Sequence, residues 1–497
     1  MSKIAVVLTT VALAGGVLLS VSYTETVDGM SKVQARTVAT TASAQPNLVF
    51  ILTDDMRKDD LRYMPKTKNL LQSKGMTFEN AFVSNSLCCP SRATIMRGQY
   101  SHNNGVWSNA PTTDATKSGG WQTYKSAGNE LDNVATRLNA AGYRTALIGK
   151  YLNGYGRTTN VPPGWDRWFA AFTPSTYRYF DYAINDNGII RHYGTRNSDY
   201  KTDVLSMKTN AFIANSAPRG PFFAYVAPVA PHKPAIPAPR DAHAHDGING
   251  PRLPSFNEKD VSDKPSFIGQ LPRLTAAQIA EIDTRHERRV ESLQAVDDLV
   301  GTMVSTLRNA RVMGRTYIFL TSDNGYHHGE HRIPEGKWRP YEEDVHMPLV
   351  VRGPGVAAGS TTYRLILNTD YLPTFTDLAG AQTPPYVDGR TLEPVLHDSV
   401  SGWRNAILLE APRSVARPGY RGIRTVGTGT TPKSKYVEYA SGARELYRLG
   451  PDPYELTNTY DSASPPNTLA AQLQALKTCA AKATLPNVTC QTAEGGE

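Results

Sequence analysis

Two pairs of oxygen-bearing side chains are the first candidates for chemistry in this chain. Asp54 and Asp55 form one pair, Asp323 and Asn324 form the other, and no cysteine or histidine is interleaved with either. Such oxygens suit a hard cation such as Ca²⁺, which takes about six to eight oxygen ligands, better than they suit zinc. Each pair alone also fits a structural role, since the first could cap a helix and the second, before Gly325, could form a turn. The chemical interpretation therefore depends on other reactive residues.

The four cysteines of the chain fall into two pairs. Cys88 and Cys89 are adjacent, and adjacent cysteines rarely satisfy disulfide geometry with each other, so they could simply be small buried hydrophobic residues. Cys479 and Cys490 lie near the C-terminus, and in an exported protein we expect them to close a short disulfide loop. Cys88 and Cys89 are then without partners. In an oxidising compartment this is a hazard unless one of them is chemically converted.

Four apolar segments are predicted to be buried β-strands that position the reactive residues. They span residues 48–52, 143–148, 222–226 and 316–320. In an open α/β sheet, ligands bind at the carboxyl ends of the strands, so the polar residues that follow these segments should converge on one crevice. Those residues are Asp54 and Asp55, Lys150, His232, and Asp323 and Asn324.

Alternating strands and helices predict an α/β fold with a large, mostly parallel sheet. An apolar stripe at Leu131, Val134 and Leu138 predicts a helix before the second strand. A longer stripe predicts a helix before the strand at residues 316–320. Its members are Leu293, Val296, Val300, Met303 and Leu307.

The segment between residues 234 and 274 is predicted to be a long loop at the rim of the active site. It is rich in Pro, Gly, Asp and Lys and shows no period, and long loops of this kind are uncommon unless they are functional. It contains a run with two histidines between two aspartates, Asp241, His243, His245 and Asp246. A solvated loop is favoured over a metal site there, because no further ligand follows at a fixed offset.

The C-terminal part is predicted to be a smaller α+β subdomain. Segments 420–424, 435–439 and 445–449 alternate as half-buried antiparallel strands do, and a terminal helix is expected near residues 468–481. The predicted organisation is an export segment and pre-region at residues 1–44, a catalytic α/β domain at residues 45–356 and the subdomain at residues 357–497.

The N-terminus predicts export. Lys3 is followed by an apolar run from Ile4 to about Val21, and Ala42-Ser43-Ala44 has a small-x-small pattern well beyond that run. The run is at the short end of the roughly 20 residues that span a membrane. Secretion is favoured, with an uncleaved membrane anchor as the alternative.

The net charge of +8 favours anionic partners. Nucleic acid is not expected as a partner, because the sequence has no dense Lys/Arg run, no stripe of alternating aromatic and basic residues and no zinc-finger spacing.

The run Cys88-Cys89-Pro90-Ser91-Arg92 resembles the Cys-x-Pro-Ser-Arg signature of the type I sulfatases. The resemblance extends in order from Asn47 to Asn458 and is closest to the N-acetylglucosamine-6-sulfatase and extracellular heparan sulfatase branch. Further segments that carry it are Gly98-Gln99-Tyr100-Ser101-His102-Asn103, Gly149-Lys150-Tyr151-Leu152-Asn153, Ser322-Asp323-Asn324-Gly325-Tyr326-His327, and Leu446-Tyr447 with Asp452-Pro453. It implies an alkaline-phosphatase-like α/β sandwich that hydrolyses sulfate monoesters, with sulfated sugars such as glucosamine-6-sulfate or heparan-like chains as the expected substrates.

The resemblance also implies roles for individual residues. A formylglycine-generating enzyme would oxidise Cys88 to formylglycine, whose hydrate attacks sulfur with one hydroxyl and releases sulfate when the other loses its proton. The implied Ca²⁺ ligands are Asp54, Asp55, Cys88 in its modified form, Asp323 and Asn324. Arg92 would hold the hydrated aldehyde, while Lys150, His232 and Lys337 would surround the sulfate.

Two histidine roles are expected at this site. His232 is the candidate proton donor to the leaving alcohol, because histidine holds a proton near neutral pH; its alternative is a structural histidine in a Pro-rich turn. His327 is assigned to substrate binding, although the adjacent His328 fits the same role. For Lys150 and Lys337 the alternative is the usual exposed surface lysine.

The sequence departs from the broader sulfatase pattern at two places. Many arylsulfatases have a histidine two residues after the lysine of the Gly-Lys motif, where this chain has Leu152 followed by Asn153, as in the glucosamine-6-sulfatase branch. The usual Leu-Thr-Gly end of the signature is Met96-Arg97-Gly98 here, which bears on recognition by the modifying enzyme. The alternatives left open are an arylsulfatase of broad specificity, a phosphonate or phosphodiester hydrolase with the same nucleophile, and a polyanion-binding protein without catalysis.

Overall fold

The computed structural model describes residues 5–13, 16–27, 30–38, 45–114, 116–414, 418–427, 432–480 and 489–495, with the backbone alone for residues 5–38. The chain divides into two compact units, Met1–Gln45 and Pro46–Glu497. In the first unit, β1 (Ala5–Leu13), β2 (Gly16–Val27) and β3 (Met30–Val38) form an antiparallel sheet. Export of this segment stays a prediction, and Ala42-Ser43-Ala44 lies outside the described residues. Among the described residues, no helix is both long and apolar enough to cross a membrane.

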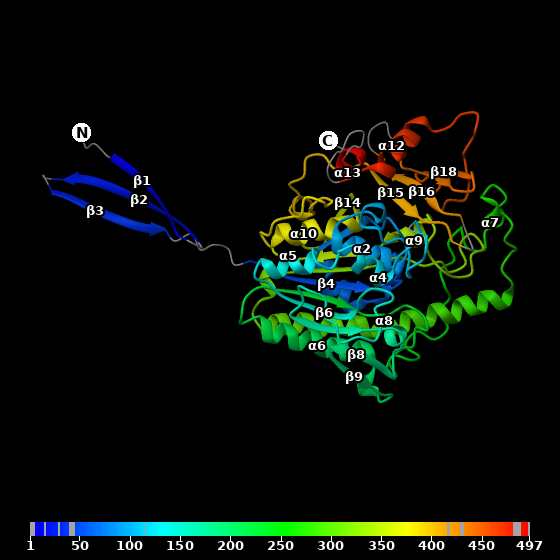
Figure 1. Cartoon of the computed structure of the whole chain (residues 1–497), viewed down its shortest axis with the longest axis horizontal. Helices are drawn as coiled ribbons and strands as arrows, with labels where there is room; N and C mark the ends of the chain where they lie inside the picture. Colours follow the sequence, from blue (N-terminus) through cyan, green and yellow to red (C-terminus); the bar gives the residue numbers. More distant parts are fainter. Residues whose placement is uncertain are drawn as a thin grey trace. The chain divides into compact units, whose positions relative to one another are not determined.

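An 11-stranded mixed sheet forms the centre of the second unit (Figure 1). Its middle strands β11, β4, β10 and β6 are parallel neighbours in that order, and they are the four strands that the apolar segments predict. Strand β14 pairs with β5 at one side of the sheet. In spatial order the path is β12 (His346–Met347), β5 (Met76–Phe82), β13 (Leu349–Arg352), β11 (Thr316–Ser322), β4 (Asn47–Thr53), β10 (Phe222–Ala227), β6 (Arg144–Lys150), β7 (Arg167–Ala171), β8 (Tyr182–Asp186) and β9 (Ile189–Tyr193), with β14 (Ser360–Leu367) beside it.

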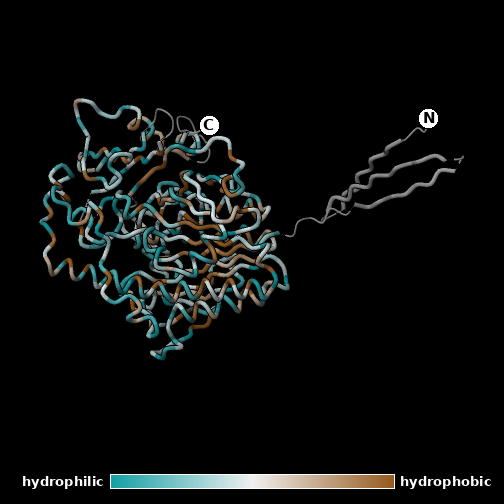
Figure 2. The backbone as a smooth tube through the Cα atoms, turned by 180° about the vertical axis from the view of Figure 1, so that it is seen from behind, coloured by the Kyte–Doolittle hydropathy of each residue, from teal (hydrophilic) through white to brown (hydrophobic). Residues whose placement is uncertain are grey.

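Helices cover both faces of this sheet, which confirms the predicted α/β sandwich. Strand β4 shows why: Leu48, Phe50 and Leu52 pack into one core, and Val49 and Ile51 pack into the other. Figure 2 shows the hydrophobic residues gathered on these central strands. On one face lie α2 (Cys88–Arg97), α4 (Gly120–Ser126), α5 (Val134–Ala140) and α10 (Tyr371–Leu378), and on the other lie α6 (Lys201–Ser216) and α8 (Ala276–Asn309) (Figure 1).

Helix α8 bears out the predicted apolar stripe, whose five members are all buried. Helix α5 begins later than predicted. Asn133 caps it by accepting hydrogen bonds from the backbone N–H groups of Ala135 and Thr136. Leu131, predicted on this helix, therefore precedes it and is 75% exposed, so that part of the prediction is wrong.

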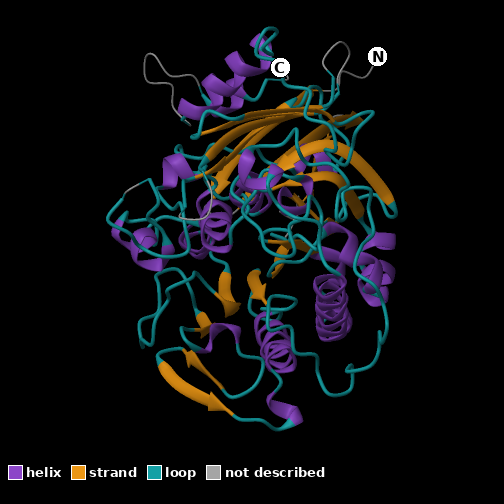
Figure 3. Ribbon diagram, turned by 90° about the vertical axis from the view of Figure 1, so that its right-hand side faces the viewer, coloured by secondary structure: helices purple, strands orange, loops and turns teal. Residues whose placement is uncertain are grey.

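A separate four-stranded antiparallel sheet lies in the C-terminal part (Figure 3). It consists of β15 (Ala406–Ala411), β16 (Tyr420–Thr425), β17 (Ser434–Tyr439) and β18 (Arg444–Arg448), with α12 (Asn467–Thr478) packed against it. The three predicted strands correspond to β16, β17 and β18. The domain boundary at residue 356 stays a prediction; β14 and α10, which follow it in sequence, join the large sheet and its core.

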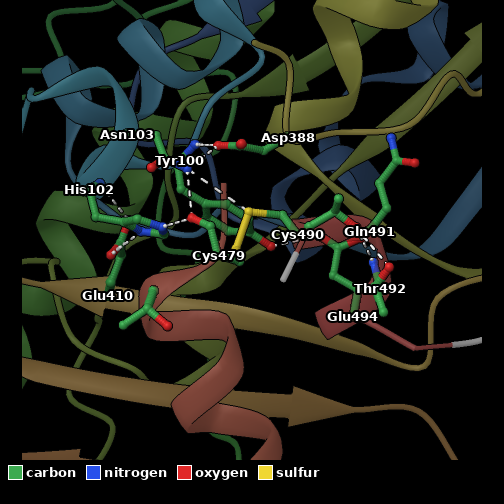
Figure 4. Close-up of a disulfide and its surroundings, with 12 residues drawn as sticks. Tyr100, His102, Asn103, Asp388, Glu410, Cys479, Cys490, Gln491, Thr492 and Glu494 are labelled. Carbon is green, nitrogen blue, oxygen red and sulfur yellow. Dashed lines mark hydrogen bonds and ion pairs between the residues drawn. A yellow bond between two sulfur atoms is a disulfide. The ribbon is translucent and has the colours of Figure 1, made fainter. Parts of the chain in front are cut away.

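A disulfide joins Cys479 to Cys490 (Figure 4). Next to it, His102 makes hydrogen bonds through both ring nitrogens, to the Glu410 carboxylate at 3.1 Å and to the Cys479 carbonyl at 3.0 Å. Both partners only accept, so both nitrogens carry protons and the ring is an imidazolium. Burial alone would lower the pKa of His102, but Glu410 and the Cys479 carbonyl raise it above 6.5.

Replacing His102 with glutamine should make the stability of the fold less dependent on pH. A raised folded-state pKa gives stability that is complete below the unfolded-state value, about 6.5, and is lost as pH rises through the folded-state value. We expect H102Q to lose about 1–2 kcal/mol of unfolding free energy near about pH 6 and less near about pH 9. Denaturant unfolding at both pH values measures this. The exposed His192 supplies the control variant H192Q, and equal losses for H102Q at the two pH values would contradict the assignment.

Candidate active site

The candidate site lies at the carboxyl ends of the four central parallel strands. Asp54 and Asp55 follow β4, Asp323 follows β11, Lys150 is the last residue of β6, and the loop after β10 carries His232. The main chain of Asp54 also pairs with this loop, its N–H donating to the Ala230 carbonyl at 3.3 Å. The sheet therefore brings together residues that are up to about 270 positions apart in sequence, as their places at the strand ends predict.

Cys88 is the first residue of helix α2 and is completely buried. Pro90 is tolerated in the first turn, where its missing N–H would have no helical partner, and Gly98 ends the helix in the left-handed conformation at φ 65°. The Cys88 Sγ lies 3.6 Å from Asp54 Oδ1 and 2.7 Å from Lys337 Nζ. Burial, the largest influence, raises the pKa of the Cys88 thiol to about 11 despite Lys150 and Lys337, so the unmodified thiol is protonated near neutral pH.

Arg92 lies one turn after Cys88 and is also completely buried. Its Nε donates to Asp323 Oδ2 at 2.8 Å and its Nη1 to the Lys150 carbonyl at 3.0 Å. The guanidinium therefore ties α2 to the ends of β11 and β6.

The charges of the site compensate one another. Lys150 Nζ lies 2.5 Å from Asp54 Oδ2, and Lys337 Nζ forms an ion pair with Asp55 Oδ1. Burial would raise the pKa of Asp54, but Lys150, His232 and Arg92 lower it to about 2. For both lysines burial would lower the pKa, and the neighbouring carboxylates outweigh it and raise the pKa above the ordinary value. Three carboxylates, those of Asp54, Asp55 and Asp323, and three cations, Lys150, Lys337 and Arg92, are thus held in place before any ligand arrives.

The residues present fit a divalent cation. Asp54, Asp55, Cys88 and His232 place one potential ligand atom each within 4.8 Å of one another. Asn324 donates its Nδ2 to Asp55 Oδ1 at 2.7 Å, while no described residue donates a hydrogen bond to its buried Oδ1. An oxygen in that position suits a cation. Asp323 is engaged differently: its Oδ1 accepts from the Asp55 N–H at 3.1 Å and its Oδ2 accepts from Arg92.

His232 faces the carboxylates with one ring nitrogen. Its Nδ1 lies 2.7 Å from the Lys233 carbonyl, which only accepts, so Nδ1 carries a proton and Nε2 points to Asp55 Oδ2 at 3.6 Å. Burial lowers the pKa of His232, although Asp55 and Asp54 oppose the change.

His327 is placed differently from the other predicted site residues. It is completely buried, its Nδ1 lies 2.6 Å from Asp344 Oδ1, and its ring contacts are with Tyr341 and His331. The structure thus brings Cys88, Arg92, Lys150, His232 and Lys337 together but gives His327 other contacts, and the substrate-binding role of His327 stays a prediction. In the loop after residue 234, His243 is largely exposed and pairs with Asp246.

Two residues contact the site that the sequence did not single out. Tyr177 stacks on His232 with ring centroids 4.1 Å apart and lies under Lys150 Nζ at 4.8 Å, while Asn153 Nδ2 donates to its hydroxyl at 2.7 Å. Arg289 of α8 donates to the carbonyls of Asp55 and Pro231. Asn153 lay in a recognised motif and could have been found there; Tyr177 and Arg289 carry no motif.

Comparison with known families gives two matches. The family model described as Sulfatase matches residues 46–381, and that described as N-sulphoglucosamine sulphohydrolase, C-terminal, matches residues 329–481.

Curated relatives include the human N-acetylglucosamine-6-sulfatase, which is 37% identical over 376 residues, covering 74% of this chain and 67% of that protein. The putative extracellular sulfatase Sulf-1 homolog of Caenorhabditis elegans is 32% identical over 382 residues, which cover 74% of this chain. The matched region is 52% of the C. elegans protein, so the chain spans about half the length of that relative.

Solved structures share the fold. A protein in complex with its substrate D-glucosamine-2-N,6-O-disulfate aligns with a TM-score of 0.72 and 24% identity over 86% of this chain and 97% of its own. The phosphonate monoester hydrolase of Agrobacterium radiobacter aligns with a TM-score of 0.66 and 22% identity over 87% of this chain and 95% of its own.

Proposed function

This chain belongs to the sulfatase family, and we propose that it hydrolyses the sulfate monoesters of sulfated sugars with Cys88, converted to formylglycine, as the nucleophile. The observation that carries the proposal is the position of Cys88, buried at the start of α2 and in contact with both Lys337 and Asp54. The hydrate of formylglycine supplies a nucleophilic hydroxyl where the Cys88 Sγ now lies. A formylglycine-generating enzyme is the partner that this modification requires.

The surrounding side chains fit the charge of a sulfate ester. Its peripheral oxygens are anionic, and preorganised cations around the reacting group usually supply the largest catalytic effect. Lys337 contacts Cys88 and Lys150 contacts its neighbour Asp54, so both supply positive charge near the nucleophile, and Arg92 fixes the carboxylates of Asp54 and Asp323. We assign the protonation of the leaving alcohol to the imidazolium form of His232, whose Nε2 faces the site and whose charge Asp55 and Asp54 stabilise against the effect of burial.

We propose that the cation is Ca²⁺, held by Asp54, Asp55, Asp323, Asn324 and the modified Cys88. When bound it supplies Lewis acidity and orients the nucleophile. Oxygen donors predominate in this set, which favours Ca²⁺ over zinc.

Removal of the cation should abolish turnover reversibly. Dialysis against a chelator is expected to lower kcat by at least about 100-fold, because the Lewis acidity and the orientation of the nucleophile that the cation would supply are then lost. Readdition of Ca²⁺ should restore activity more fully than Mg²⁺, which demands a smaller octahedral site. Isothermal titration of the chelated protein measures binding apart from turnover. Activity that survives complete chelation, with no metal left by elemental analysis, would contradict this assignment.

A sulfated sugar is the favoured substrate because the relatives at 35–37% identity are named N-acetylglucosamine-6-sulfatase. An arylsulfatase of broad specificity is the first alternative. Phosphonate or phosphodiester hydrolysis is the second, since a phosphonate monoester hydrolase shares the fold.

The substrate class is tested by comparing kcat/KM for glucosamine 6-sulfate, an aryl sulfate, and aryl phosphonate and phosphodiester esters of the same leaving group. We expect the sulfate esters to exceed the phosphorus esters by at least about tenfold, with the sugar sulfate highest. Preference for phosphorus would overturn the proposal. Tight binding of sulfated glycans without any turnover would instead favour a polyanion-binding protein.

We also propose that the protein is exported. The Cys479–Cys490 disulfide suits an oxidising compartment, and the C. elegans relative is named an extracellular sulfatase. Residues 1–44 would serve as the export segment, with retention as a membrane anchor as the alternative.

A further inference from the structure

A basic cavity of about 340 Å³ lies near the candidate active site. Its charged lining comes from the loop after β10, from one face of α8 and from the segment that leads to Lys337. The charged residues are Lys233, Glu281, Arg285, Arg288, Arg289 and Glu335. Four cations thus face two carboxylates in this lining, and Arg289 also pairs with Asp60 at 3.7 Å, so a smaller surplus of positive charge remains.

The carboxylates of this cavity are already engaged. Glu335 accepts from the Tyr326 hydroxyl at 2.9 Å and pairs with Arg285 at 3.2 Å and Lys233 at 3.5 Å. Glu281 pairs with Arg285 at 3.8 Å. Arg288 is exposed, and within the described part of the chain no hydrogen bond or ion pair holds its guanidinium. The surplus charge is therefore available to a ligand.

Two further donors in this lining lack acceptors. Arg289 has a side chain 2% exposed, and its buried Nε has no hydrogen-bond partner among the described residues. The Nε of Arg285 is also buried and has no hydrogen-bond partner among the described residues. A buried donor without an acceptor is unfavourable, and guanidinium groups bind sulfate and carboxylate oxygens strongly. The exposed guanidinium of Arg288 is the group that a ligand in the cavity would contact first, and Arg285 and Arg289 add positive charge behind it.

The cavity lies close to the candidate active site. Lys233 directly follows His232, and Glu335 lies two residues before Lys337. Arg289 reaches the other way and donates to the carbonyls of Asp55 and Pro231. The cavity is therefore near the loop that carries His232 and the strand end that carries Asp55.

We propose that this cavity binds a second acidic group, a sulfate or a carboxylate, of the same sugar substrate. The protein then acts on polyanionic glycans in preference to sugars with a single sulfate. This inference rests on the proposed function and adds to it the residues that recognise the second charge, with Arg288 and Lys233 at the entrance and Arg285 and Arg289 deeper in.

The preference is tested with matched probes and one variant. Glucosamine 6-sulfate carries one acidic group, and glucosamine 2-N,6-O-disulfate carries two. We expect the wild-type protein to show a kcat/KM about tenfold higher for the disulfate, and R288A to lose most of that ratio. A 6-sulfated glucosamine linked to a uronic acid tells whether a carboxylate fits as well as a sulfate. An unchanged ratio in R288A would overturn the inference.

Arg308 supplies the matched control, because it is an exposed arginine of the same helix. It lies 20 residues after Arg288, which is about 30 Å along α8. R308A changes the net charge by the same amount and should keep the wild-type ratio. A ratio lowered equally in R308A would show a general charge effect and would also overturn the inference.

A binding measurement separates failure of this inference from failure of the proposed function. In a C88A background no nucleophile is present, so calorimetry gives the Kd of the disulfate without turnover. We expect R288A in this background to weaken the Kd by at least about fivefold. If wild type hydrolyses no sulfate ester but this difference holds, the proposed reaction fails and the anion site stands. If turnover is present and the Kd is unchanged, the anion site fails alone.

Discussion

Replacing Cys88 with alanine is expected to lower kcat/KM for any sulfate ester by at least about 10⁴-fold. Alanine has no group that can be converted to an aldehyde, and loss of a nucleophile that works as part of a unit removes nearly all of the chemical acceleration. The variant should still fold, because alanine fits the first turn of α2 and Cys88 makes no disulfide. Initial rates with an aryl sulfate and a sugar sulfate measure the loss. Mass spectrometry of the peptide with Cys88 shows whether the wild-type residue carries an aldehyde.

Cys89 gives a control of the same residue type one position away. It is also completely buried, but it packs into the hydrophobic core, and its backbone N–H donates to Asn109 Oδ1. C89A should therefore keep its turnover and lose about 1 kcal/mol of unfolding free energy. Equal loss of turnover in both variants would mean that Cys88 and Cys89 support activity only by maintaining the folded structure. Full activity of C88A, or an intact thiol throughout active wild-type protein, would defeat the proposed mechanism.

The sheet could be predicted because its central strands are continuous apolar runs. Strands β4, β6, β10 and β11 are buried on both faces, so their sequences show no polar interruption and stand out from the rest. Their carboxyl ends then place Asp54, Asp55, Lys150 and Asp323 together. The neighbour order β11, β4, β10 and β6 could not be predicted, because it depends on which strands pair across long connections.

Two residues that contact the site, Tyr177 and Arg289, could not be predicted from the sequence, and the reason is physical. Tyr177 and Arg289 reach the site only through tertiary packing, one from a short turn between β7 and β8 and the other from the middle of α8. Neither has a spacing relative to Cys88 that a motif could record. The prediction that Leu131 lies on helix α5 was wrong for a local reason, because the Asn133 cap fixes the start of the helix after it. Hydrophobic spacing alone does not show where a helix begins.

The geometry also explains how a strongly charged site can be buried in a stable fold. An isolated buried charge is costly, but here Asp54 contacts Lys150 and Asp55 contacts Lys337, while Arg92 holds Asp323. The same contacts keep the cations in position for an anionic ligand, so little reorganisation is needed when charge develops on the sulfate. Electrostatic stability and catalysis thus depend on the same residues, and a variant must be tested for both.

Replacing Lys150 with methionine is expected to lower kcat by about 100- to 1000-fold, as for loss of one preorganised donor to an anionic transition state. The Lys150 side chain is completely buried, with its Nζ 2.5 Å from Asp54 Oδ2. Methionine has a similar volume and no charge, so Asp54 loses the cation that most strongly lowers its pKa and becomes a less stable buried anion. We therefore also expect a loss of about 3–5 kcal/mol of unfolding free energy. Steady-state kinetics, corrected for the folded fraction from denaturant unfolding, separates the two effects.

Lys435 provides the control that distinguishes catalysis from stability. It is completely buried in β17 and pairs with Glu455 at 2.7 Å and Glu342 at 2.9 Å, away from Cys88. K435M breaks a buried ion pair of the same kind, so it should lose a similar free energy of unfolding while each folded molecule keeps its kcat. If K150M and K435M lose stability equally and both keep kcat, Lys150 is a structural cation only. A fall in kcat confined to K150M instead places its charge beside the sulfate, because the two variants then differ only in where the lost cation stood.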